Sequence, residues 1–315
     1  MKIRVITYNI DGLPNELDLS TLPWVLKPIA WIYKMIKKTT IVKINDNSDT
    51  SEKIKNISKY ISKSDANLVG VQEDFNYHEE LMSSFAPGDF ICGKCSNKFS
   101  LENLFSKIEC WTYFPLPRFK SDGINLLMGK GASYNIDSED IVPWKKSNGY
   151  ISHANDLLTH KGFRYYQVNL KDDINLDVYI VHMDADFYDP INCPNVKKDI
   201  AARKSQFEQL IRYIANKYKE GHTNPIIIMG DTNSYDKYYW DVENVKYFIN
   251  NLNYISGFNC KEAVPYNDTD CDRIFYINLD KANYELSLSL SMIDDSCNGL
   301  SDHKPLVVDF ELSKK

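Results

Sequence analysis

The sequence lacks the features that mark several classes of protein. Only six of its 315 residues are arginine and its formal net charge is −6, so it has no overall basic field for a long duplex, although a local basic groove remains compatible with this charge. Its seven cysteines are scattered, unlike the dense disulfide framework of a small secreted protein. It has no internal repeat and no low-complexity linker. With 43% hydrophobic and 25% charged residues, the composition is globular and excludes a disordered or fibrous protein.

The spacing of the cysteines identifies neither a metal site nor a redox motif. Cys92 and Cys95 form a single C-x-x-C pair, and no second pair follows to complete a zinc site. No thioredoxin-like pattern surrounds the pair either. We therefore expect reduced thiols in a reducing compartment, and the role of Cys92 and Cys95 stays open.

The N-terminus shows no signal peptide, because Met1 and Lys2 lead directly into an apolar, β-branched run. We expect a cytoplasmic monomer, while secretion stays open if a leader has been removed. The most apolar stretch, residues 22–36, is about fifteen residues long and contains Lys27 and Lys34. It is too short and too charged to span a bilayer.

Short apolar runs rich in β-branched residues dominate the chain and predict strands. These runs are residues 3–8, 67–72, 124–128, 163–170, 178–182, 225–229, 273–277 and 306–310. In residues 286–292, leucine or methionine alternates with serine, which predicts another strand with one buried face.

Helical spacing predicts fewer helices. A capping box at Asp49 and Glu52 precedes isoleucines that continue to Ile61, and two further helices are predicted over about 196–218 and 242–252. Many strands with few helices between them favour two packed sheets with helices outside. We expect one domain over residues 1–315, with an insertion at about 14–48.

Polar residues cluster where the predicted strands end. Taken singly, an aspartate after a strand is usually a turn former or helix cap, and a lone histidine is usually structural. Here the pattern repeats in order, which favours one shared edge of a sheet. An edge with several carboxylates, two asparagines and two histidines suits a hard cation with oxygen ligands, so we expect Mg²⁺ or Mn²⁺. The residues are Asn9, Asp11, Glu73, His182, Asp184, Asp186, Asp231, Asn233, Asp272, Asp302 and His303.

The order of these motifs resembles the endonuclease/exonuclease/phosphatase superfamily, whose fold is DNase I-like. The Gly-Asp-x-Asn and Ser-Asp-His-x-Pro motifs are the most specific, and the matches together span residues 1–312. The resemblance implies a four-layer α/β sandwich with its site at one sheet edge, and metal-dependent hydrolysis of a phosphoester. The matching segments are residues 8–13, 71–73, 182–185, 230–234, 272–274 and 301–305.

The resemblance implies a set of metal ligands. Glu73 is the principal ligand, helped by Asn9 and Asp302. Asp11 matches a position that approaches the metal or the phosphate in some branches. A divalent cation held there neutralises the phosphate and stabilises the leaving alkoxide.

It also implies catalytic roles. Asp231 orients or deprotonates the attacking water, and Asn233 holds a phosphate oxygen. His303, paired with Asp272, donates to the phosphate or neutralises its charge. His182 contacts the phosphate or the leaving oxygen. An aspartate behind a histidine fixes its tautomer and favours its charged form, which supports the Asp272–His303 pair.

The substrate is less determined, because the superfamily acts on DNA, phosphoinositides and sphingomyelin. Residues 156–165 and 182–186, followed by Arg203 and Gln206, resemble the neutral sphingomyelinase branch, although Asp184 stands where that branch has glutamine. We therefore expect a phosphodiester substrate on a phospholipid headgroup. A magnesium-dependent endonuclease or exonuclease acting on nucleic acid is the alternative. An inositol polyphosphate phosphatase, suggested by residues 271–274, is the third.

Residues 22–33, inside the insertion, form an apolar segment with Trp24, Lys27 and Trp31. Beside the site, such a segment can lie in a membrane interface and provide a lipid-binding surface. A helix packed on the core explains the same pattern equally well, so both interpretations stay open.

Overall fold

The computed structural model describes residues 1–12, 50–75, 77–83, 85–86, 89–92, 122–129, 134–148, 161–171, 174–185, 196–264 and 271–315. Outside these ranges lie the whole predicted insertion at about 14–48, with its segment 22–33, and Asp49, Cys95, residues 156–160 and Asp186. The elements are β1 (Lys2–Asn9), α2 (Thr50–Lys63), β2 (Leu68–Gln72), α3 (His78–Ser83), β3 (Phe90–Cys92), β4 (Asn125–Gly129), β5 (Asn135–Pro143), β6 (Gly162–Lys171), β7 (Ile174–His182), α5 (Val196–Lys219), β8 (Ile226–Asp231), α6 (Tyr239–Asn253), β9 (Phe258–Glu262), β10 (Asp272–Leu279), β11 (Tyr284–Ile293), η4 (Asp295–Cys297) and β12 (Leu306–Lys314).

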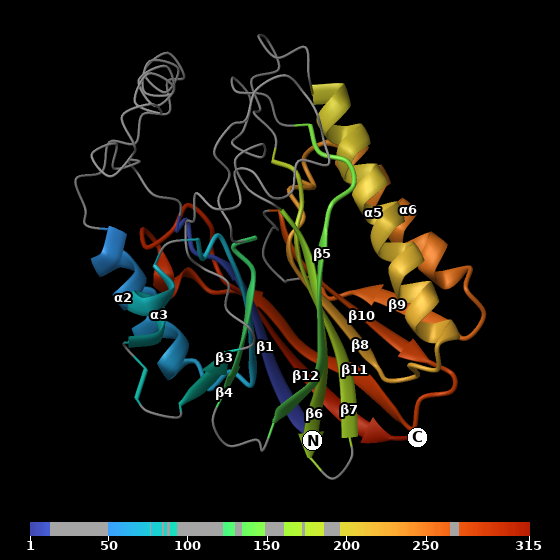
Figure 1. Ribbon diagram of the computed structural model, residues 1–315, viewed down its shortest axis with the longest axis horizontal. Coiled ribbons are helices and arrows are strands. Elements are labelled where there is room, and N and C mark those ends of the chain that lie inside the picture. The colour runs from blue at the N-terminus through green and yellow to red at the C-terminus, as the bar shows by residue number, and fades with distance from the viewer. Residues whose placement is uncertain are drawn as a thin grey trace, which may run out of the picture.

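Two six-stranded sheets form the centre of the molecule (Figure 1). One has the strand order β11-β12-β1-β2-β4-β3 and the other the order β5-β6-β7-β8-β10-β9. Each sheet contains one parallel pair, β1 with β2 and β7 with β8, among antiparallel neighbours. Both sheets are therefore mixed.

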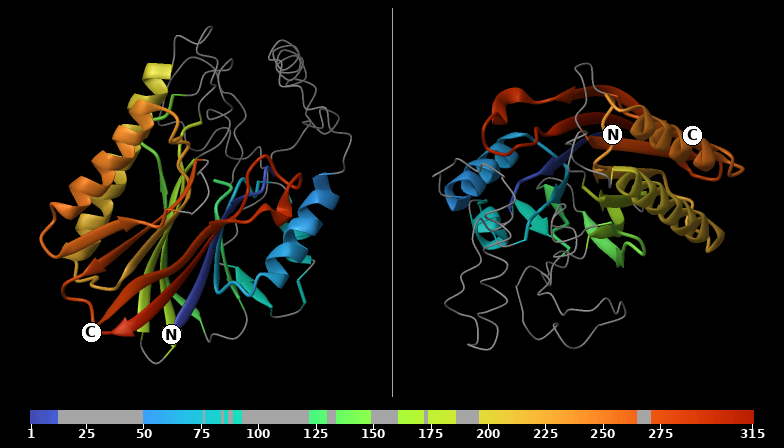
Figure 2. Two further views of the ribbon diagram at one scale, coloured as in Figure 1. Left: turned by 180° about the vertical axis from the view of Figure 1, so that it is seen from behind. Right: turned by 90° about the horizontal axis from the view of Figure 1, so that it is seen from above.

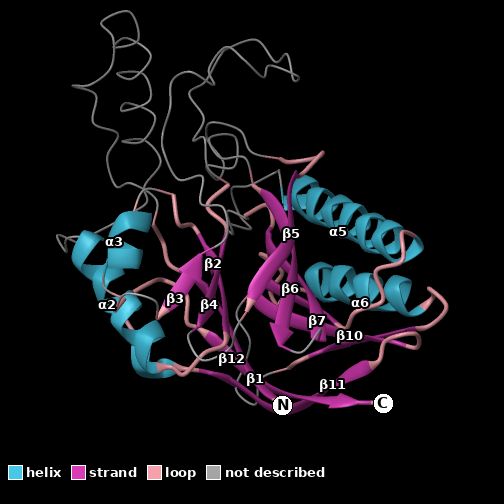
Figure 3. Cartoon of the chain, turned by 60° about the horizontal axis from the view of Figure 1, so that its bottom comes forward, coloured by secondary structure: helices cyan, strands magenta, loops and turns pink. Residues whose placement is uncertain are grey.

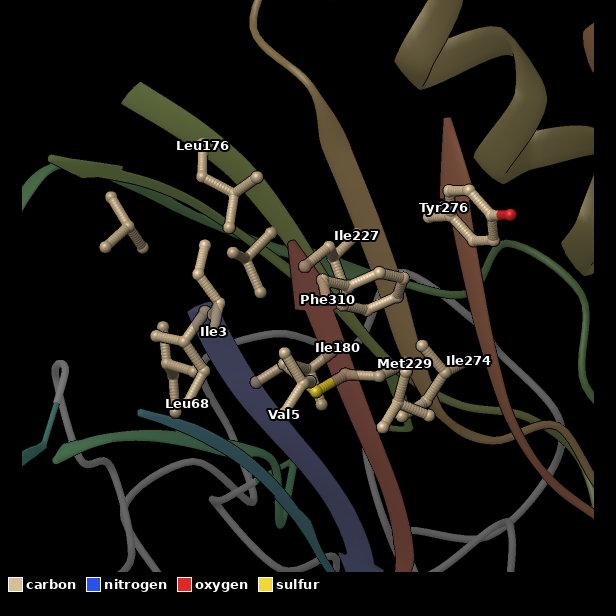
Figure 4. Close-up of a cluster of buried hydrophobic side chains, with 14 of the residues drawn as sticks. Ile3, Val5, Leu68, Leu176, Ile180, Ile227, Met229, Ile274, Tyr276 and Phe310 are labelled. Carbon is tan, nitrogen blue, oxygen red and sulfur yellow. The ribbon is translucent and has the colours of Figure 1, made fainter. Parts of the chain in front are cut away.

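Apolar side chains from both sheets meet between them, as Figure 4 shows for Val5, Leu68, Ile180, Met229 and Phe310. A second core lies where α5 and α6 cover the outer face of the β5–β9 sheet. A third lies where α2 and α3 cover the other sheet (Figures 2 and 3). The molecule is thus helix, sheet, sheet, helix, which confirms the predicted four-layer α/β sandwich.

The predicted strands and the three predicted helices are present, with boundaries shifted by a few residues. Five elements of the described part of the chain were not predicted: the short helix α3, the 3-10 helix η4, the three-residue strand β3, and strands β5 and β9. No helix in the described part of the chain combines the length and apolar character needed to cross a bilayer.

Two expectations were wrong. Leu288, Leu290 and Met292 of β11 are 37–38% exposed rather than buried. The pairing with β12 shifts between Leu288 and Leu290, and this irregularity moves the core-facing side from Leu286 to Ile293.

The second concerns the thiols. Cys92, expected to be reduced, takes part in a disulfide bond. Cys260, Cys271 and Cys297 are free and buried, as expected of reduced thiols.

Candidate active site

Strand pairing brings the predicted site residues to one edge of the two sheets. The parallel β1–β2 pair sets Asn9 opposite Gln72, so Glu73 emerges beside it. The parallel β7–β8 pair sets His182 opposite Asp231. Strand β10 runs antiparallel to β8, and its first residue, Asp272, therefore also faces Asp231.

Strand β12 supplies the last group. It runs antiparallel to β1 and begins at Leu306, opposite Thr7, so the preceding loop reaches the same edge. Within that loop the Ser301 hydroxyl donates to the Asn9 carbonyl oxygen at 2.8 Å and accepts from the His303 amide at 3.1 Å. These bonds fix His303 beside Asn9.

The centre of the site is a compact group of possible metal-ligand atoms from the half-buried Glu73 and the buried His182 and Asp231. Nε2 of His182 lies 3.7 Å from Oε1 of Glu73 and 3.6 Å from Oδ2 of Asp231. The Asn9 amide nitrogen donates to both carboxylates, at 3.1 and 3.0 Å. Neither ring nitrogen of His182 has a hydrogen-bond partner among the residues that the structure describes. A buried imidazole in that condition is an exception that calls for a functional explanation.

A divalent cation fits this group. One ligand atom each from Glu73, His182 and Asp231 lies within 4.8 Å of the others. Burial and the neighbouring Lys161 hold the pKa of His182 well below its ordinary value, so the neutral ring offers a lone pair. Burial raises the pKa of Glu73 to about 7, against the opposing effects of Lys161 and Asn9. A cation beside that carboxylate would restore its charged form.

His303 and Asp272 form the predicted pair. Nδ1 of His303 lies 2.6 Å from Oδ2 of Asp272, and its Nε2 faces Asp231 Oδ2 at 3.9 Å. Burial alone would lower the pKa of His303, but the charge and hydrogen bond of Asp272 outweigh it and raise that pKa well above its ordinary value. The ring is therefore cationic at neutral pH.

Asp231 responds to that charge. Burial alone would raise its pKa, but the cationic His303 and Lys161 outweigh burial and hold it below the ordinary value. The backbone amide of Asn233 also donates to Asp231 Oδ1 at 2.8 Å. The site thus holds two carboxylates whose pKa values are displaced in opposite directions, as in many acid–base sites.

The backbone around the site is strained. Among the described residues, four other than glycine have a positive φ, and three belong to the predicted site: Asp11 (48°), Glu73 (60°) and Asn233 (48°). Left-handed backbone is unfavourable for such residues and gathers at functional sites. Gly12 lets the two segments of backbone pass close together at this point, because a Cβ on residue 12 would lie 2.3 Å from the Glu73 carbonyl oxygen.

The remaining predicted residues lie at the margin of this group. Asp302 is 73% exposed at its side chain, and its Oδ1 lies 3.9 Å from Nε2 of His303. Asp11 is exposed, and its amide donates to Asn9 Oδ1. Asn233 is buried, with its side-chain amide donating to the Met183 carbonyl oxygen at 3.0 Å.

The sequence prediction missed Lys161. This side chain is only 8% exposed, its Nζ donates to the Met183 carbonyl oxygen at 3.3 Å, and its charge acts on Glu73, His182 and Asp231. A signal was present, because Lys161-Gly162-Phe163 carried part of the sphingomyelinase resemblance.

Asp184 follows β7 but has a different function from His182. Its carboxylate accepts from the Asn148 amide and from the Gln206 side chain, the latter at 2.8 Å. Arg203 donates to the Asp184 carbonyl oxygen and pairs with Asp241 at 2.8 Å. Arg203 and Gln206 are buried, so these residues fasten α5 to the end of β7.

No protein-family model and no curated protein matches the chain. Solved structures match nearly its whole length. A humanized D. rerio TDP2 with 14 mutations is 15% identical with a TM-score of 0.59, over 98% of this chain and 99% of that chain. Beta toxin from Staphylococcus aureus is 15% identical with a TM-score of 0.57, over 99% of this chain and 100% of that chain.

The catalytic domain of human Nocturnin, with a bound sulfate anion, is 17% identical with a TM-score of 0.54, over 99% of this chain and 95% of that chain. These neighbours are members of the endonuclease/exonuclease/phosphatase superfamily. Likeness at this level of identity establishes the fold. The chain therefore has the DNase I-like α/β fold of that superfamily.

Proposed function

We propose that the chain is a divalent-metal-dependent phosphodiesterase that hydrolyses its substrate with an activated water. One observation carries the proposal: the buried imidazole of His182, which no described residue hydrogen-bonds, faces Glu73 and Asp231 beside the cationic His303–Asp272 pair. Together these side chains provide a cation-binding site, a base for the attacking water and a hydrogen-bond donor for the phosphate at one edge of the sheets. Phosphodiester hydrolysis needs all three.

The residues divide the reaction between them. Asp231, kept anionic by neighbouring positive charge, accepts the proton of the attacking water. His303 stays protonated because Asp272 stabilises its cation, and it donates to a phosphate oxygen. Asn233 is the second phosphate-binding group.

We propose that Glu73 and Asn9 hold the cation, for which Mg²⁺ or Mn²⁺ is proposed, and that His182 joins them as a ligand in place of the phosphate contact that the resemblance implied for it. When bound, such an ion neutralises the phosphate oxygens and stabilises the leaving alkoxide. Asn9 directs its amide nitrogen at Glu73 and Asp231, and a rotation of that amide would present its oxygen instead. Asp302 and Asp11 remain predicted auxiliary ligands.

For the substrate we propose a phosphodiester on a phospholipid headgroup. The support is the sphingomyelinase-like Lys161-Gly162-Phe163 segment and the scarcity of arginine. Arg203 and Gln206, which also carried that resemblance, fasten α5 and do not bear on the substrate. The cytoplasmic monomer stays a prediction.

Nucleic acid is the alternative substrate. It is supported by the likeness to D. rerio TDP2, one structure of which is complexed with a single-strand DNA product. Inositol polyphosphates stay third, because only residues 271–274 support them.

The test compares three substrates with the full chain: soluble bis(p-nitrophenyl) phosphate, sphingomyelin vesicles and supercoiled plasmid. Each is assayed with Mg²⁺, with Mn²⁺ and with a chelator. We expect chelator-sensitive hydrolysis of the soluble diester and release of phosphocholine. Nicking of plasmid without phosphocholine release would put the nuclease first, and no chelator-sensitive hydrolysis of any substrate would refute the proposal.

A further inference from the structure

Two adjacent aromatic side chains stand exposed at the start of α6. Tyr239 and Trp240 are 66% and 62% exposed, and their rings contact each other edge to face with centroids 5.0 Å apart. Exposed aromatic surface of this size costs hydration free energy that a partner can recover. We name Tyr239 and Trp240 the α6 aromatic pair.

The backbone beneath the pair is tied down from two sides. The Arg273 guanidinium, on β10, donates to the Ser234 carbonyl oxygen at 2.8 Å and to Asp236 at 2.5 Å. Arg203, on α5, holds Asp241 at 2.8 Å, and Asp241 also accepts from the Tyr235 amide. The pair is therefore presented on a fixed turn, which limits the entropy lost when it binds a surface.

The pair belongs to the same edge as the candidate site. The chain runs from Asn233 through this turn into α6, which starts at the end of the sheets where β8 finishes and then runs back (Figure 1). Helix α6 has 15 residues, about 22 Å in length, so Tyr254 stands at its far end. Tyr254 is 85% exposed, yet it lies away from the catalytic edge.

A lysine, Lys237, precedes the pair by two residues in the sequence. Nζ of Lys237 lies 5.1 Å from the ring centroids of both Tyr235 and Tyr238. Tryptophan and tyrosine rings are enriched at membrane–water interfaces, where they sit at the level of the headgroups. A lysine among them can meet lipid phosphate, so the group has the chemistry of an interfacial anchor.

We infer that the α6 aromatic pair, with Lys237, docks the enzyme on a phospholipid surface that carries its substrate. The inference rests on the proposed phosphodiesterase function and extends it to the surface from which the substrate is taken. Stacking on nucleic acid bases suits the rings less well here, because single strands need a positively charged groove. Among residues 235–243, Lys237 is the only cationic side chain.

The test uses the full chain with vesicles of phosphatidylcholine and sphingomyelin. In a Tyr239→Ala/Trp240→Ala variant we expect vesicle co-sedimentation to weaken by at least about tenfold, and hydrolysis at limiting lipid to fall in parallel. Melting temperature and the rate on bis(p-nitrophenyl) phosphate should match the parent. Tyr254→Ala is the control and should bind vesicles like the parent.

A second measurement keeps an aromatic side chain at position 240. Bromine-labelled lipid should quench part of the parent's tryptophan fluorescence, and Trp240→Phe should remove that part while still binding vesicles. Unchanged vesicle binding in the double variant, or an equal loss in the Tyr254 control, would overturn the inference, as would an equal loss on the soluble diester. Loss of single-strand DNA binding alone would also overturn it. Vesicle binding is measured without any catalytic step. A failed phosphodiesterase assay would therefore leave the membrane-docking inference testable.

Discussion

Strand β7 carries a buried acid–histidine group near each end, and the two groups differ in how their polar atoms are used. Toward its start, Asp177 accepts from Asn224 at 2.9 Å, and the Tyr165 hydroxyl lies 3.3 Å from Asp177 and 3.0 Å from Nδ1 of His222. At its carboxyl end, His182 faces two carboxylates with neither ring nitrogen hydrogen-bonded to any described residue. The first group is closed by its own bonds, whereas the second has capacity left for a ligand.

Their electrostatics differ in the same way. Burial raises the pKa of Asp177 to about 6, and its hydrogen bonds and neighbouring cations only partly oppose this. Asp231 is equally buried, yet cationic neighbours hold its pKa below the ordinary value. Similar residue types thus give a structural cluster at one end and a reactive one at the other. The difference lies in the positive charge that faces Asp231 and in the ring nitrogens of His182, which no described residue hydrogen-bonds.

The largest expected effect on hydrolysis comes from the carboxylates at the carboxyl end of β7. Glu73→Gln keeps the shape but removes an anionic ligand, so turnover and metal affinity should both fall. Asp231→Asn should lower turnover by about 10²–10⁴-fold with a smaller loss of metal affinity, because the base is removed. Rates on bis(p-nitrophenyl) phosphate across a magnesium titration separate the two. Asp177→Asn is the matched control, and if it reduced the rate as strongly, the contrast between the two ends would fail.

A smaller effect is expected at the histidine pair. His303→Ala should cost about a hundredfold in rate, the scale of a general acid or oxyanion donor. In Asp272→Asn the pKa of His303 should drop, because the charge that raises it is gone. The protonated ring is then lost at lower pH as pH rises, so the activity optimum should move to lower pH. A pH–rate profile identical to that of the parent would break the pairing.

Asp177 should influence stability and leave hydrolysis unchanged. Its folded pKa of about 6 exceeds the ordinary value of 3.8, so the folded state binds this proton more tightly than the unfolded chain. This group should therefore add stability as pH falls from about 6 to about 4, by up to about 3 kcal/mol. Urea unfolding of the parent and Asp177→Asn at several pH values measures it. A stability difference that stays constant with pH would contradict the assignment.

Sequence was informative where one local pattern decides the outcome. Continuous β-branched runs predicted the buried strands, and acids placed directly after them predicted the shared edge. Strand β5 was not predicted because it lies at a sheet edge and has no fully buried position, so its sequence carries many polar residues. The prediction of which face of β11 is buried was wrong, because the pairing irregularity at Leu288 reverses the alternation of its side chains.

The site was harder to complete than the fold. Lys161 has no periodic signature, and it reaches Met183 only because β6 pairs with β7. Asp184 carries the same strand-end signal as His182, yet it is bound by Asn148 and Gln206. Whether a strand-end acid serves a ligand or a neighbouring helix depends on tertiary contacts that no single segment contains.

The central claim is the proposal that Glu73 and His182, with Asn9, hold a divalent cation beside Asp231. Calorimetric titration of Mn²⁺ into the chelator-treated chain, Glu73→Gln and Asp177→Asn tests it most directly. The account predicts one site in the parent, the same site with unchanged affinity in Asp177→Asn, and a loss of at least about tenfold in affinity for Glu73→Gln. Equal binding by Glu73→Gln and the parent would contradict it.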